Sequence, residues 1–270
     1  MNTKRIWIVS LHSLAMFLLS WIMLFLLLNL MMAVFSFSIG IPMELHFHRS
    51  YFLIPPSSWT ADIVKLLFIS PQVVSFSYAA GCLLVLYYVN QYSGLLKLFF
   101  IWGFVHGWAG CFGGMVAGML TNTGFGYAAD WMYLFDTMKL FLSLLSMVFL
   151  LLGGFMISRS FQMSANICFS EIKEDMFPRF IFFQVTVVVV AGTVIQLFMR
   201  IPAPVGLQLV LPANVVMLLP VILKGRGFND LQFDESVRDF HLHCQLLIAT
   251  CIILAIARLI FGYGVRVGGA

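Results

Sequence analysis

Charged residues are scarce in this sequence. Lys, Arg, Asp and Glu together make up 10% of its 270 residues, whereas hydrophobic residues make up 61%. Soluble globular domains carry roughly 25% charged and about 45–50% apolar residues, so water alone does not solvate a chain of this composition. The scarcity of charge excludes soluble enzyme folds and disordered tails. It predicts an integral membrane protein, with the lipid bilayer as its first partner.

The sequence also lacks a cysteine framework. Its five cysteines contain no Cys-x-x-Cys pair and fall mostly within apolar segments, which argues against a disulfide-stapled module and against a cysteine-based zinc site. The net charge of +4 comes from basic residues that are scattered at the ends of apolar segments. This distribution indicates membrane topology and no nucleic-acid partner.

Familiar catalytic motifs are missing as well. The chain has no Walker loop, no Gly-x-Ser-x-Gly elbow and no two-carboxylate aspartyl motif. The order of His106, Asn214 and Asp230 resembles that in intramembrane site-2-type metalloproteases, but Gly107 and Gly110 stand where the general-base Glu and the second His ligand are required. Too few ligands remain for a catalytic zinc. The sequence therefore favours a non-enzymatic role and identifies no cofactor.

Seven stretches of the chain are long and apolar enough to cross roughly 30 Å of hydrocarbon, which takes about 20 helical residues. They lie near residues 10–36, 66–89, 98–120, 137–157, 180–199, 205–223 and 244–263. Continuous apolar runs predict helices, because barrel strands alternate in segments of about 10 residues. We expect an all-α polytopic transmembrane bundle of about seven spanning helices, in one domain over residues 1–270. The link between the fifth and sixth stretches is short, so a re-entrant pair stays open as an alternative there.

Lys and Arg are distributed unevenly between the two ends of the expected helices. With the N-terminus inside, the cytoplasmic connections contain Lys4, Arg5, Lys97, Arg159, Lys173, Arg179, Lys224, Arg226 and Arg238. The opposite side has Arg49, Lys65, Arg200 and Arg266. Because cytoplasmic loops are enriched in Lys and Arg, we expect a cytoplasmic N-terminus and a C-terminus on the opposite side of an inner or plasma membrane.

Small residues recur every four positions in the third apolar stretch, where Gly110, Gly114 and Gly118 form one row. Such rows let two helix backbones approach closely within a membrane. Three interpretations stay open: packing within the bundle, contact with a membrane-protein partner or a second copy of the chain, and a backbone that lines a substrate path.

A few uncharged or switchable polar residues fall at membrane depth. His106 lies in the glycine-rich stretch, and an ionisable side chain at that depth normally faces the bundle interior. Asn214 and Asn29 lie in the sixth and first stretches. Together with the glycine row, these side chains are candidates for a substrate or ion path; the alternative is that His106 only bonds to a neighbouring helix.

A second candidate site precedes the second apolar stretch. Glu44, His46 and His48 occupy alternate positions, which share one face of an extended segment. With Asp130, expected on the same side of the membrane, they form a speculative site for zinc or another divalent ion. The alternative is that these side chains are simply solvated.

Three classes of function remain. The first is a small-solute or ion carrier that uses the polar, glycine-lined core. The second is a non-catalytic membrane subunit or scaffold of a larger complex. The third, and least favoured, is a membrane-embedded enzyme acting on a lipid-linked substrate.

Overall fold

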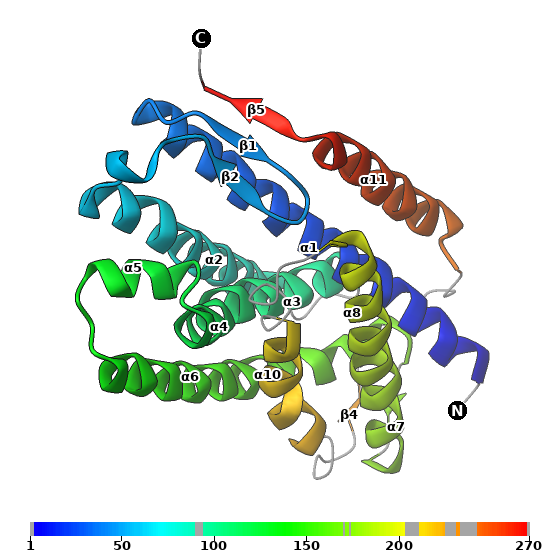
Figure 1. The fold of residues 1–270 in the computed structure, drawn as a ribbon. Coiled ribbons are helices and arrows are strands. Elements are labelled where there is room, and N and C mark those ends of the chain that lie inside the picture. The colour runs from blue at the N-terminus through cyan, green and yellow to red at the C-terminus, as the bar shows by residue number, and fades with distance from the viewer. Residues whose placement is uncertain are drawn as a thin grey trace.

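The computed structural model describes residues 3–89, 94–169, 171–172, 174–202, 211–224, 231–232 and 242–268. The fold is mostly helical (Figure 1). Its α-helices are α1 (Thr3–Ser38), α2 (Ala61–Val89), α3 (Leu95–Trp108), α4 (Gly114–Thr121), α5 (Phe125–Trp131), α6 (Asp136–Met163), α7 (Phe177–Ile181), α8 (Val188–Met199), α10 (Leu211–Lys224) and α11 (Cys244–Tyr263).

Two π-helical segments interrupt the long helices. Segment η2 (Ala109–Gly113) joins α3 to α4, and η5 (Phe182–Val187) joins α7 to α8. The 3-10 turns are η1 (Pro56–Ser58), η3 (Ser164–Ile167) and η4 (Glu174–Met176). Single π turns inside α-helices occur frequently at functional sites, so both segments are candidate positions for such a site.

Six helical segments are long and apolar enough to cross a membrane: Ile6–Ser38, Ala61–Val89, Leu95–Thr121, Asp136–Ile167, Phe177–Met199 and Cys244–Tyr263. The prediction of a multi-pass helical membrane protein is thereby supported by helix length and composition. The number of about seven spans is not confirmed. The expected stretch 205–223 overlaps α10, whose 14 residues extend only about 21 Å at 1.5 Å per residue. The first part of that stretch, 205–210, lies outside the described residues.

Helix α3 lies at the centre of the bundle. Its span is the most buried of the six, at 61%, and it packs against α1, α2 and α6 (Figure 1). Trp102 in the middle of α3 meets Ser13 of α1, and Gly110 beyond its end meets Leu24. Helices α1 and α3 therefore run in the same direction.

Helix α11 also runs parallel to α1. At one end, the backbone N–H of His243 donates to Nε2 of His12 over 3.0 Å; further along, the backbone N–H of Phe47, just beyond the end of α1, donates to the carbonyl of Phe261 over 2.9 Å. The two ends of the chain consequently lie at opposite ends of the bundle (Figure 1). Which end faces the cytoplasm stays a prediction from the distribution of Lys and Arg.

A three-stranded sheet, in the order β2-β1-β5, lies beside the second half of α1 and adds a small β element, which the all-α prediction did not include, to the mostly helical fold. It contains β1 (Met43–Leu45), β2 (Ser50–Phe52) and β5 (Val265–Val267), all antiparallel. Alternation explains its two faces: Met43 and Leu45 are buried, whereas Glu44 lies opposite Arg266 on the other face. A second sheet has only β3 (Glu171–Ile172) and β4 (Leu231–Gln232).

Helices α8 and α10 cross the direction of α6 steeply (Figure 1). Glycine permits close contact at two places: Gly192 of α8 lies directly against the ring of Phe17, and Gly154 of α6 lies directly against the carbonyl of Met217 in α10. The guanidinium of Arg200, just after α8, stands over Trp21 at 5.5 Å. Trp21 is near the middle of α1, so α8 ends well before α1 does.

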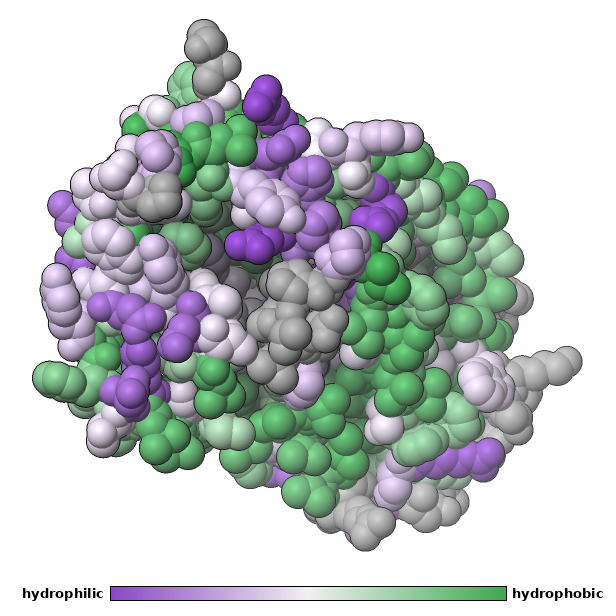
Figure 2. Space-filling model, viewed as in Figure 1, coloured by the Kyte–Doolittle hydropathy of each residue, from purple (hydrophilic) through white to green (hydrophobic). Residues whose placement is uncertain are grey.

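The surface agrees with membrane insertion. Figure 2 shows hydrophobic residues over α11 and along the lower edge of the bundle, while hydrophilic residues gather near the strands and at the connection between α5 and α6. Lipid is the solvent that such apolar helix faces require.

Candidate functional site

His106 is paired within the bundle. Its side chain is buried, at 5% exposure, and Nε2–H donates to the carbonyl of Phe17 over 3.0 Å. The ring of Phe17 also meets the imidazole edge-on, with centroids 4.3 Å apart. This geometry matches the structural interpretation, in which a neutral histidine bonds to a neighbouring helix.

A chain of hydrogen bonds ties α3 to α1 and η5. Nε1–H of Trp102 donates to Ser13 Oγ over 2.8 Å, and Ser13 Oγ–H donates to the carbonyl of Gln184 over 3.2 Å. Ser10 similarly donates to the carbonyl of Phe183 over 3.0 Å. Both acceptors lie in the π turn of η5, whose altered backbone bonding changes how its carbonyls are presented. These hydroxyls therefore satisfy the backbone of the irregular turn.

The glycine row packs inside the chain. A Cβ at Gly107 would lie 2.7 Å from the carbonyl oxygen of Ser75, and one at Gly110 would lie 3.2 Å from the hydroxyl of the same serine in α2. A Cβ at Gly114 would have only ordinary contacts, and one at Gly118 would meet the backbone of the turn before α5. The face that the sequence offered to a partner helix is thus occupied by α2 and by this turn.

Several polar atoms on and around α8 have no hydrogen-bond partner. We call this group the α8 seam and define it by Gln184, Thr186, Thr193, Gln196 and Asn214. The unpartnered atoms are Gln184 Oε1, both threonine hydroxyls, both amide atoms of Gln196, and Asn214 Oδ1. Gln196 is 0% exposed.

The seam follows one helix and continues onto its neighbour. Thr193 and Gln196 are three residues apart, which places them on the same side of α8. Asn214 lies near the start of α10, and α10 lies next to both α8 and η5. The seam thus brings six unpartnered polar atoms to α8, η5 and α10, while further such atoms, in Ser70, Ser158 and Gln162, lie on α2 and α6.

Such atoms are expensive inside a membrane protein. Leaving a buried donor or acceptor unpaired costs about 1–3 kcal/mol in proteins, and several kcal/mol when hydrocarbon surrounds it. Buried polar groups of this kind normally bind ordered water or a ligand. The α8 seam is consequently the best candidate for a functional site among the described residues.

The two asparagines expected at membrane depth differ. Asn29 donates from Nδ2 to the carbonyl of Phe25, one turn earlier in its own helix, over 2.8 Å. Asn214 is buried at 4% exposure, and its Oδ1 lacks a partner. Of the predicted path residues, Asn214 alone belongs to the α8 seam, whereas His106 and Asn29 are bonded elsewhere.

The residues predicted to hold a metal separate into two places. Glu44 Oε1 lies 3.7 Å from His46 Nε2, and the rings of His46 and His48 are 5.5 Å apart. Burial, followed by the nearby His46, Arg258 and Arg49, lowers the pKa of His48. Within the described ranges, no group of three or more His, Cys, Asp or Glu side chains is close enough to hold a metal ion. The speculative metal site therefore finds no support there.

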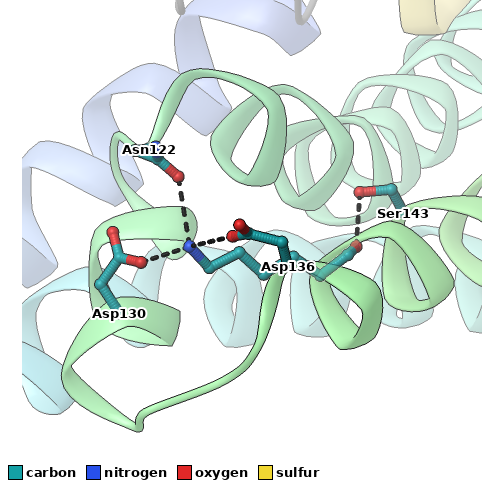
Figure 3. A network of polar contacts seen from close by, with 5 residues as sticks. Asn122, Asp130, Asp136 and Ser143 are labelled. Carbon is teal, nitrogen blue, oxygen red and sulfur yellow. Dashed lines mark hydrogen bonds and ion pairs between the residues drawn. The ribbon is translucent and has the colours of Figure 1, made fainter.

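Asp130 belongs instead to a network around Lys139 (Figure 3). Nζ of Lys139 bonds to Asp130, lies 3.6 Å from Asp136 Oδ1, and donates to Asn122 Oδ1 over 3.4 Å. Ser143 Oγ–H in turn donates to the carbonyl of Lys139 over 2.9 Å. The network joins the start of α6 to α5 and the turn before it, which is a structural role.

Sequence reasoning does not identify Thr193 and Gln196 as site residues. They are three residues apart, and Arg200 follows four residues after Gln196, a spacing that places all three on one polar face of a helix. The stretch 180–199 is so apolar as a whole that it predicts only a spanning helix.

Comparisons of this chain with protein-family models, with curated proteins and with solved structures gave no match.

Proposed function

We propose that this multi-pass membrane protein is a carrier for a small polar solute, and that the α8 seam forms part of its path. The observation that carries the proposal is Gln196, whose fully buried amide has neither a donor nor an acceptor partner. A carrier must exchange the hydration shell of its solute for protein groups, and unpaired amides and hydroxyls supply both donors and acceptors.

Two contacts favour the carrier over the other two classes. The glycine row, one of the features that favours a subunit, packs against α2 and the turn before α5. The enzyme hypothesis requires Glu44, His46 and His48 to converge with the outer acids, and Asp130 is engaged with Lys139. We place the N-terminus of the carrier in the cytoplasm, on the distribution of Lys and Arg.

The proposal is tested by solute entry into proteoliposomes. Purified protein is reconstituted, and stopped-flow light scattering follows recovery of volume after a step into urea, glycerol, potassium chloride or potassium acetate. We expect recovery faster than in protein-free liposomes for at least one solute, and we expect Gln196→Met to abolish the difference.

The matched control is His106→Gln, which keeps an N–H donor in the same helix environment. Its rate should stay within about twofold of the wild type, because His106 is bonded to Phe17 and lies outside the seam. Recovery equal to that of protein-free liposomes for all four solutes would refute the carrier proposal, as would undiminished transport by a folded Gln196→Met variant.

A further inference from the structure

Two arginines stand where α8 ends. Arg200 is half-buried, its guanidinium lies over the ring of Trp21 at 5.5 Å, and its Nε has no hydrogen-bond partner. Arg258 of α11 is also half-buried and lies over the ring of Phe47 at 5.8 Å. The two rings are neighbours, with centroids 5.9 Å apart.

A backbone contact brings the second arginine to the first. Nη2 of Arg258 donates to the carbonyl of Ile201 over 2.8 Å, and Ile201 directly follows Arg200. Both guanidinium groups are thereby positioned at the same corner of the bundle, each supported by an aromatic ring. Stacking of this kind orients a guanidinium and leaves its N–H edge available for bonding.

Neither cation is neutralised by the chain. In the part of the chain that the structure describes, the ion pairs involve other residues, and no carboxylate oxygen lies within 4.0 Å of Arg200 or Arg258. The nearby Glu44 is close to His46 and faces Arg266 across the sheet. The corner therefore carries an excess of positive charge.

The arginine pair is continuous with the α8 seam. Gln196 lies one helical turn before Arg200, so the two side chains share a face of α8. Gln196 is fully buried, and both polar atoms of its amide are unpartnered. A planar guanidinium binds carboxylate and phosphate oxygens in pairs.

We infer that Arg200 and Arg258 form an oxyanion site at the end of the α8 seam, and that the solute carries a carboxylate or phosphate group. The part of the inference that makes the ligand a transported solute rests on the proposed function. The same chemistry also fits the phosphate of a lipid headgroup, and the experiment separates the two sources.

Trp21 is the natural reporter, because an oxyanion that binds Arg200 changes the environment of the ring beneath it. The protein is placed in phosphatidylcholine nanodiscs, and its tryptophan fluorescence is titrated with inorganic phosphate. Subtracting the signal of a Trp21→Phe variant isolates Trp21. A second set of nanodiscs contains phosphatidylglycerol in a phosphate-free buffer.

We expect a saturable change in Trp21 fluorescence in at least one arm. A response to phosphate assigns the site to a free oxyanion, and a response to phosphatidylglycerol alone assigns it to a headgroup. Arg200→Gln should raise the half-saturating concentration at least tenfold, and Arg200→Lys should weaken binding less. Arg266→Gln, a matched change on the strand β5, should leave it within twofold.

No response in either arm would overturn the inference, and so would an unchanged response in a folded Arg200→Gln variant. Because binding is measured without transport, the two proposals fail separately. Binding without solute entry into proteoliposomes would refute the carrier, while entry of urea or glycerol without oxyanion binding would refute the arginine site.

Discussion

Helix α3 and the helix formed by α7, η5 and α8 both pack beside α1, and both carry polar side chains at depth. In α3, the indole of Trp102 and the imidazole of His106 donate to groups on α1. In α8, Gln196 is buried and Thr193 is partly buried, and their side-chain polar atoms have no hydrogen-bond partner. The difference distinguishes polar residues that hold helices together from polar residues that the chain leaves unpaired.

Distance from α1 does not account for this contrast. Helix α3 runs along α1, and small residues close its contact with α2. Helix α8 also follows α1, from Gly192 against the ring of Phe17 to Arg200 over the ring of Trp21. Gln196 lies between these two contacts on the same face of α8, and its amide still has no partner on α1.

The largest expected effect tests the close packing of α3. Gly107→Ala adds a Cβ 2.7 Å from the carbonyl oxygen of Ser75 and 2.8 Å from the backbone nitrogen of Ala79, so the two helices must move apart. We expect a loss of about 1–3 kcal/mol of stability, measured by SDS-induced unfolding in mixed micelles.

Gly81→Ala is the control for that change. Its Cβ would meet nothing within 4 Å, and replacing glycine by alanine within a helix stabilises by about 0.5–1 kcal/mol. Equal effects of the two substitutions would show that helix propensity, and not close approach, governs the α2–α3 contact.

Trp102→Phe tests the hydrogen-bonded chain between α3 and α1. The change removes the donor to Ser13 and part of the apolar surface buried against Phe17 and Phe161. We expect a loss of about 1–2 kcal/mol in the same unfolding assay, with transport retained. A Trp102→Phe variant that is fully stable but inactive would show that Trp102 has a functional role. The contrast between a structural α3 and a functional α8 would then be wrong.

Two glutamines on the same helix sharpen the comparison. Gln184 donates from Nε2 to Ser164 Oγ over 2.7 Å, so Gln184→Met should destabilise the protein by about 0.5–1.5 kcal/mol. Gln196 has no such bond, so Gln196→Met should leave the stability unchanged or slightly raised. Thermal unfolding in detergent compares the two, and a larger loss for Gln196→Met would contradict our assignment.

The smallest effect is expected at the network around Lys139. Asp130→Asn removes a half-exposed partner of this lysine, whereas Asp136 is fully exposed. Exposed ion pairs contribute little and are screened by salt. The midpoint of thermal unfolding should fall slightly for Asp130→Asn and hardly at all for Asp136→Asn, with the difference shrinking at high salt. A loss of transport in either variant would point to a role beyond structure.

Much of the fold could be predicted because lipid imposes long apolar helices. The stretch near 98–120 and its glycines identified the central helix, and small residues indeed close its contact with α2. The strands could not be predicted, since alternation over Met43–Leu45 is too short to read and its partner β5 lies at the other end of the chain. The count of about seven spans is not confirmed, because α10 has 14 residues and residues 205–210 before it lie outside the described part of the chain.

The candidate site was predictable only in part. The sequence identifies Asn214 and His106, since an ionisable side chain at membrane depth normally faces the bundle interior, but it does not single out Gln196. Whether a polar side chain is paired depends on distant neighbours: the acceptor for His106 is the carbonyl of Phe17 in another helix. The spacing of polar residues along the sequence predicts a polar helix face. Only the tertiary packing shows whether the polar atoms on that face have hydrogen-bond partners.

Access of water to the α8 seam tests the central claim most directly. Thr193→Cys and Ser13→Cys are made in a background in which the exposed Cys244 and Cys251 are serine, and each protein in nanodiscs is treated with a water-soluble methanethiosulfonate. We predict that the cysteine at position 193 reacts and that the one at position 13 does not. Equal protection of both positions would mean that the seam is dry, and would contradict the account.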